Sequence, residues 1–167
     1  MNNNNYQDPI LKKIRDLLNE NGAKELKNRY YLGEPLSVAK SELPICFVEF
    51  RSQQVADSSA FEIETRALVR VTVAVDLTRD LGGRNKQANS HGTLNRIMCG
   101  RDEKFRLLDD SILGILIKNQ DAGLNGERLA FNIGEGVEVS YDLAQLGEEV
   151  FVRTASLEFW VTHRQAV

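Results

Sequence analysis

One long stretch of alternating residues constrains the fold of this chain more than any other feature. Between Glu62 and Leu77, most odd positions are apolar and most even positions are charged or polar. The apolar residues are Ile63, Ala67, Val69, Val71, Val73, Val75 and Leu77. A period of two is typical of a strand with one buried and one solvent-exposed face. About 15 residues at roughly 3.3 Å each give a strand of about 50 Å, long for a small domain. Such a strand bends at a bulge or extends past its own core toward a partner.

The other segments predict a small set of helices and strands. Asp8 caps a helix that runs to Asn21, with Pro9 in its first turn. A second helix is predicted over 102–119, and residues 53–60 are predicted to be a polar connection. Further strands are predicted near 26–32, 45–50, 128–133, 137–141 and 150–164. In the last strand, Phe151, Ala155, Leu157, Phe159 and Val161 are expected to face inward.

This order of elements has no strand–helix–strand rhythm, so the predicted fold class is α+β. We expect a mixed or antiparallel sheet with a long hairpin-like strand and two helices packed on one face. At 167 residues the chain is predicted to form one domain, residues 1–167.

Composition narrows the function classes. A net charge of −3 is too small to indicate a polyanion partner for the whole surface. The two cysteines, Cys46 and Cys99, cannot build a disulfide framework or a four-cysteine metal site. Neither a secretory signal nor an apolar run long enough for a membrane helix is visible. We therefore expect a soluble protein made in a reducing cytoplasm, with no membrane partner.

The segment Arg79–Arg101 is rich in glycine and basic residues and is predicted to be a mobile loop. Its basic residues are candidate partner contacts: Arg79, Arg84, Lys86, Arg96 and Arg101. Two interpretations stay open, a plain surface loop and an arm that orders against a partner protein or DNA phosphates. Because the loop contains no aromatic residue, any contact with DNA is expected to be electrostatic and nonspecific.

Trp160 and Leu68, together with Ala74, interrupt the polar faces of their predicted strands. Such residues lie either under a loop of the same chain or at an interface, and tryptophan is enriched in interface hot spots. Leu68 and Trp160 are therefore candidate interface residues.

The sequence contains no recognisable group of catalytic or metal-binding residues. The two histidines, His91 and His163, do not belong to a cluster with metal-ligand spacing. Ser90, His91 and Cys99 lack a rigid frame and an orienting third group. We predict no catalytic, metal or cofactor-binding residue, no cofactor and no enzymatic activity.

In the order of its predicted elements and in their residue patterns, the chain resembles the tail terminator (tail completion) proteins of long-tailed bacteriophages. The matching segments are the helix Asp8–Asn21, the sequence Tyr30-Tyr31-Leu32-Gly33-Glu34-Pro35 and the run Pro44–Phe50. They also include the long strand 62–77, the loop after it, the helix 102–119 and the strand 150–164.

The resemblance implies an α+β subunit that forms a six-fold ring, caps the last tail-tube ring and meets the head–tail connector. It implies a place in the tail or neck of the virion after assembly in the host cytoplasm, with no catalysis. The implied partners are further copies of the chain, the tail tube protein and connector proteins, with transient contact to DNA passing through the ring.

Three alternatives remain. A head-completion or tail-tube subunit belongs to the same structural class. A small enzyme or nucleotide-binding domain would use 79–101 as a lid. A nonspecific DNA-binding module would use the same loop and bind more weakly as salt rises.

Overall fold

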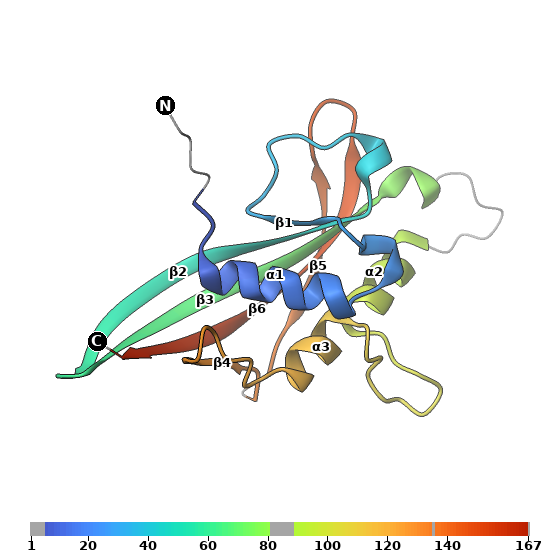
Figure 1. Cartoon of the computed structure of the whole chain (residues 1–167). Helices are drawn as coiled ribbons and strands as arrows, with labels where there is room; N and C mark the ends of the chain where they lie inside the picture. The colour runs from blue at the N-terminus through green and yellow to red at the C-terminus, as the bar shows by residue number, and fades with distance from the viewer. Residues whose placement is uncertain (1–5, 81–88, 135, 167) are drawn as a thin grey trace.

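A six-stranded mixed sheet organises the molecule, and the α+β class predicted from the sequence is confirmed (Figure 1). The computed structural model describes residues 6–80, 89–134 and 136–166. The strands are β1 (Tyr30–Leu32), β2 (Ile45–Ser59), β3 (Glu62–Asp76), β4 (Arg128–Asn132), β5 (Val139–Gln145) and β6 (Phe151–Ala166). The sheet order is β1-β2-β3-β6-β4, and β5 also pairs with β6.

Strand β3 is the centre of the sheet. It pairs antiparallel with β2 on one side and with β6 on the other, so that Val71 lies between Val48 and Leu157. Its odd residues from Ala67 to Val75 are buried, as their alternation predicts. Beyond β6 the sheet divides, because β5 pairs with residues 151–157 and β4 with residues 160–164.

Three described α-helices cover the face that carries the odd residues of β3. They are α1 (Pro9–Asn21), α2 (Asn89–Cys99) and α3 (Ile112–Lys118). The predicted first helix is confirmed, and the Asp8 carboxylate accepts a 2.8 Å hydrogen bond from the Ile10 amide at its start. Its buried Ile14 and Leu18 join the main core with Val71 and Leu157.

A second, smaller core lies on the opposite face. Val38 and Leu43, from the segment between β1 and β2, cover Phe47, Ala74 and other residues at one end of the sheet. Ala74 thus lies under a segment of its own chain, which explains this interruption of the polar face. The rest of the opposite face is left without a covering layer of described elements.

The prediction that residues 53–60 form a polar connection is wrong. Strand β2 continues to Ser59 and forms a long hairpin with β3. The register shifts between Phe50 and Ser52 and again between Asp57 and Ser59, which marks two bulges. Residues 51–56 are all exposed. The segment lacks an apolar alternation because neither of its faces is buried, so pairing with β3 alone defines it as a strand.

The helix predicted over 102–119 is wrong in its first half. The Asp102 carboxylate accepts hydrogen bonds from the backbone amides of Lys104 and Arg106, and this favours a turn over a helix. The helix begins only after Ser111, whose hydroxyl accepts a bond from the Gly114 amide. The segment 79–101 was predicted to be a mobile loop, but its second half forms α2. Leu94, Ile97 and Met98 of this helix are buried at helical spacing.

In β6 the inward-facing residues are as predicted except at the start of the strand. Ala155, Leu157, Phe159 and Val161 are buried, whereas Phe151 is half exposed. Phe151 precedes the part of β6 that lies under the helices, and the neighbouring Val152 packs into the smaller core instead.

The three long strands extend well past the helices. Figure 1 shows the β2–β3 hairpin projecting to the left, with the C-terminal end of β6 beside it. Near the hairpin turn, the side chains of Val55 and Phe61 are 66% and 80% exposed. Of the two outcomes that the sequence left open for this strand, a bend at a bulge or extension past the core, the structure shows the extension.

Val71→Asp tests the central position of β3. A carboxylate in place of a fully buried side chain has no partner, so we expect the free energy of unfolding to fall by more than about 4 kcal/mol. Urea denaturation followed by circular dichroism measures this. The matched variant Val55→Asp, on the exposed part of β2, should change stability by less than about 1 kcal/mol.

Candidate interaction site

The uncovered face of the sheet contains an acidic groove of about 500 Å³. Strands β2, β3, β5 and β6 supply most of its wall, and Phe47 and Leu146 lie at its apolar end. Its charged lining residues are Glu34, Glu49, Arg70, Glu138, Asp142 and Glu158. Five carboxylates and one guanidinium make the groove negative. A positively charged partner segment fits this charge better than an anion does.

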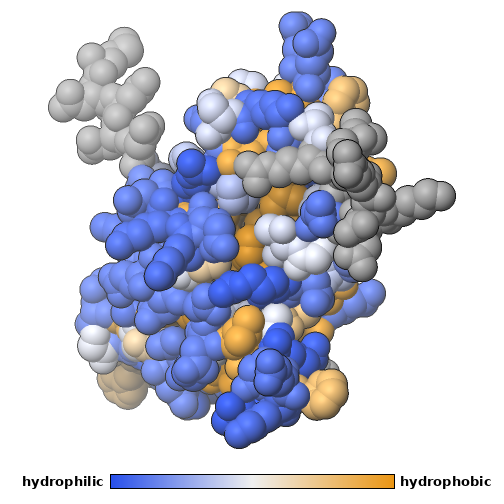
Figure 2. Space-filling view, turned by 90° about the vertical axis from the view of Figure 1, so that its right-hand side faces the viewer, coloured by the Kyte–Doolittle hydropathy of each residue, from blue (hydrophilic) through white to orange (hydrophobic). Residues whose placement is uncertain are grey.

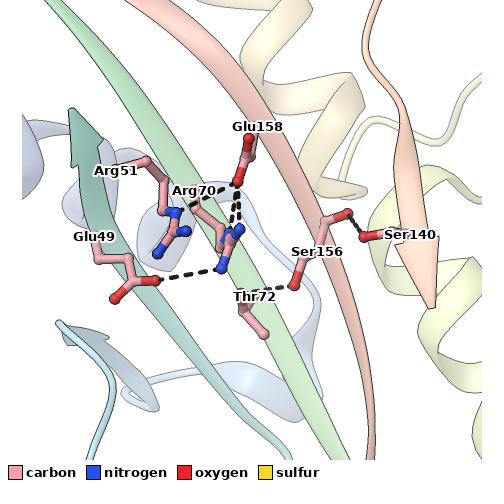
Figure 3. Close-up of polar contacts among 7 residues, drawn as sticks. All are labelled: Glu49, Arg51, Arg70, Thr72, Ser140, Ser156 and Glu158. Atoms are coloured by element: carbon pink, nitrogen blue, oxygen red, sulfur yellow. Dashed lines mark hydrogen bonds and ion pairs between the residues drawn. The ribbon is translucent and has the colours of Figure 1, made fainter. Parts of the chain in front are cut away.

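Arg70 joins the carboxylates of two neighbouring strands (Figure 3). Its Nη2 lies 2.6 Å from Glu158 Oε1 and its Nη1 lies 4.0 Å from Glu49 Oε1. The Arg51 Nε lies 3.7 Å from the same Glu158 oxygen. Cross-strand pairing places these residues side by side, because Arg70 is opposite both Glu49 and Glu158 in the register.

Hydroxyl groups continue the polar face beside the ion pairs. Thr72 Oγ1 and Ser156 Oγ lie 2.8 Å apart, and Ser140 donates a 3.4 Å bond to the Ser156 carbonyl (Figure 3). Thr72 is nevertheless only 5% exposed. These groups satisfy one another across three strands, which fixes the groove floor in one arrangement.

The two predicted interface residues, Leu68 and Trp160, are direct cross-strand neighbours. Trp160 is 39% exposed, and the Arg66 guanidinium lies 5.5 Å from its ring centroid. A second hollow of about 350 Å³ adjoins the indole and includes Arg66, Asn132 and Ile133 in its lining. The described part of the chain leaves the Trp160 side chain partly uncovered, unlike Ala74.

The predicted basic residues do not form one loop. Arg96 lies on α2, where its Nη2 is 2.6 Å from Asp110 Oδ2. Arg101 is exposed, and its backbone forms an isolated antiparallel β-bridge with Leu107. Arg84, Lys86 and the side chain of Arg79 lie outside the described residues. Arg96 thus connects α2 to the segment before α3.

Sequence reasoning missed an ordered surface loop between Arg101 and Leu107. The Asp102 carboxylate holds it together through the Lys104 and Arg106 amides and the Arg106 side chain. Phe105 is 84% exposed and has a φ of 60°, which is unusual for a bulky residue. Phe105 lies within the range 102–119 that was predicted to be a helix, and only Asp102, two and four residues before Lys104 and Arg106, could have indicated a turn.

Ser90, His91 and Cys99 contact different neighbours. Ser90 is buried and accepts a 2.9 Å bond from Arg153 Nε, whereas the His91 ring lies 4.6 Å from the Tyr141 ring. The Cys99 thiol donates to Asn95 Oδ1, which also accepts from the Tyr141 hydroxyl. Partial burial, followed by the neighbouring Cys99, raises the pKa of Tyr141 to about 12. These contacts attach α2 to β5 and β6.

Within residues 6–80, 89–134 and 136–166, no group of three or more His, Cys, Asp and Glu side chains is placed to hold a metal ion. The helices in this described part are also too short or too polar to cross a membrane. The side of the molecule shown in Figure 2 is mainly hydrophilic, with hydrophobic residues in separate areas.

The chain matches no protein-family model, and no curated protein is significantly similar to it. The candidate interaction site therefore rests on its geometry: the acidic groove, the Leu68–Trp160 pair and the exposed end of the hairpin.

Arg70→Met tests whether the guanidinium neutralises the groove. Without it, the carboxylates of Glu49 and Glu158, one on each side of β3, lose their shared positive partner, so we expect a loss of about 1 kcal/mol at low salt. The loss should shrink at high salt because salt screens the ion pairs. Urea denaturation at two salt concentrations measures both. Arg164→Met, which breaks the separate pair with Glu64, should show a smaller salt dependence of its stability change.

Trp160→Ala separates a partly exposed indole from a core residue. We expect the variant to stay folded and to lose less than about 2 kcal/mol, since the indole is 39% exposed. Thermal unfolding measures this, with Trp160→Phe as the control that keeps a ring. A variant that is unfolded at room temperature would show that the indole belongs to the core.

Proposed function

We propose that this chain is a structural subunit of a phage tail, a tail terminator that forms a ring, caps the tail tube and joins it to the head connector. The observation that carries the proposal is the far half of the sheet. There β2, β3 and β6 run beyond the helices; residues 51–56 of β2 are exposed, and most of the neighbouring β3 residues 62–66 are partly exposed. A hairpin of two 15-residue strands is ordered at some cost in chain entropy, which a partner surface would offset.

The exposed end of the hairpin supports a contact with another protein. Val55 and Phe61 present apolar side chains there, and Trp160 with Leu68 lies further along the same sheet. Aromatic side chains in partly desolvated positions are common at interface hot spots. In the proposed ring, the hairpin reaches the neighbouring subunit or the tube.

The acidic groove supports a second contact on a different part of the subunit. A ring subunit meets two neighbours through different surfaces, and it also meets the tube and the connector. The groove lies on the uncovered sheet face, while the loop with Phe105 precedes α3, whose buried residues lie in the core on the other face. In the proposal these surfaces serve partners in different directions. No cofactor takes part, and contact with DNA is transient.

Electron microscopy of the purified protein mixed with isolated tail tubes tests the proposal. We expect closed rings, with density at one end of the tubes. A variant in which Asn-Gly replaces residues 55–65 closes the hairpin at the Gln54–Arg66 pair and should fold without capping tubes.

Two results would count against the terminator assignment. Uniform small particles that ignore the tubes would contradict a ring subunit. Rings that stack into long tubes of their own would instead indicate a tube protein. A hairpin-shortened variant that caps tubes normally would remove the hairpin from the contact.

A further inference from the structure

The outer edge of β2 is an open strand edge over most of its length. Strand β1 pairs with β2 only at Cys46, Phe47 and Val48. Beyond them, no strand of the described residues pairs with β2 on that side, although β2 continues to Ser59. The six residues from Ser52 to Asp57 pair with β3 in unbroken register. Their outward amides and carbonyls form a regular row that another strand can bind.

This edge lacks the usual features that prevent pairing. Proteins commonly protect open edges with lysine, proline or bulges. Residues 51–59 contain neither lysine nor proline, and the two bulges lie at the ends of the regular stretch. A segment with this pattern is suited to binding a strand.

The sheet has a second open edge on its opposite side, along β5. This strand pairs with β6 through residues 139–145, and within the described part of the chain its other side has no strand partner. Its regular length of seven residues is close to that of the open part of β2. It also contains no lysine or proline.

The two edges match in their side chains as well. Val55 is opposite Thr65, so it lies on the face of Ala67 and Val69, while Leu143 lies on the same face through its neighbours Tyr141 and Ala155. Both are exposed, Val55 to 66% and Leu143 to 57%. If the two edges joined, these apolar side chains would come together on one face of a continuous sheet.

We propose that the β2 edge of one copy pairs antiparallel with the β5 edge of a second copy, so that the sheet continues from subunit to subunit. The inference rests on the proposed ring and names the contact that builds it. The direction follows from the fold, since β2 runs toward the hairpin turn and β5 runs away from it. The contact is head-to-tail, because each copy offers one edge of each kind.

The open edges lie at different heights along the sheet, and this favours a closed assembly. Val55 is level with Thr65 near the start of β3, whereas Asp142 is level with Thr154 and hence with Ala74 near its end. Strands in a closed barrel are tilted and staggered. The offset between the edges is a stagger of this kind.

Cross-linking between two single-cysteine variants tests the contact. In a Cys99→Ser background, Val55→Cys and Leu143→Cys proteins are mixed and treated with a short bismaleimide, which bridges thiols that are opposite or diagonal across paired strands. Cys46 is fully buried and stays in place. We expect heterodimers in the mixture and few in either protein alone. Phe61→Cys, which is even more exposed at the hairpin turn, should not cross-link to Leu143→Cys.

Lysine substitutions supply a second, independent readout. Val55→Lys and Leu143→Lys should each weaken self-association by at least about tenfold in sedimentation equilibrium, because lysine blocks an open edge. Phe105→Lys replaces an exposed apolar side chain in the loop between Arg101 and Leu107, which belongs to neither edge strand, and should have little effect. Cross-links within Val55→Cys alone would mean that two β2 edges pair, and this would overturn the proposal.

The outcomes also separate this contact from the proposed function. Tube capping without the Val55–Leu143 cross-link would leave the terminator proposal standing and sink the edge pairing. Cross-linking without tube capping would support the edge pairing and contradict the terminator. A protein that remains monomeric up to its solubility limit and gives no cross-link contradicts the edge pairing.

Discussion

The pairing of β3 with a neighbour on each side is the constraint on which the rest of the structure depends. All 15 of its residues are matched to β6, and 13 are matched to β2. Because the strand alternates, this register sends Val69, Val71 and Val73 to the helices and Arg70 and Thr72 to the opposite face. A shift of one residue would exchange these faces and bury Arg70. The apolar core and the charged groove therefore both follow from the same strand register.

Features with a local signal could be predicted from the sequence. Asp8 before Pro9 marks the first helix, and the valines of β3 mark the central strand. Residues 53–59 gave no such signal, because a strand with two wet faces has no apolar period. Around 102–111, the apolar residues suggested a helix that does not form. Hydrogen bonds from the backbone amides to the Asp102 carboxylate stabilise a turn there instead.

The candidate site was harder to predict because it joins residues far apart in the chain. Glu49, Arg70 and Glu158 meet only through the register of three strands. Leu68 and Trp160 were visible as two separate interruptions of an alternation, and pairing makes them one surface. Arg96 was expected in a mobile loop, but it lies on a helix that contributes to the core. Its guanidinium forms an ion pair with Asp110. Composition alone cannot show which charges are already paired.

A long sheet with two open edges can grow by adding further strands, and we propose that closure into a ring limits this growth. Native mass spectrometry over a range of concentrations tests this closure most directly. We expect one closed oligomer of fixed mass, with six copies as the family resemblance implies, and no series of larger species. A continuous series of oligomers that grows with concentration, or a monomer throughout, would contradict it.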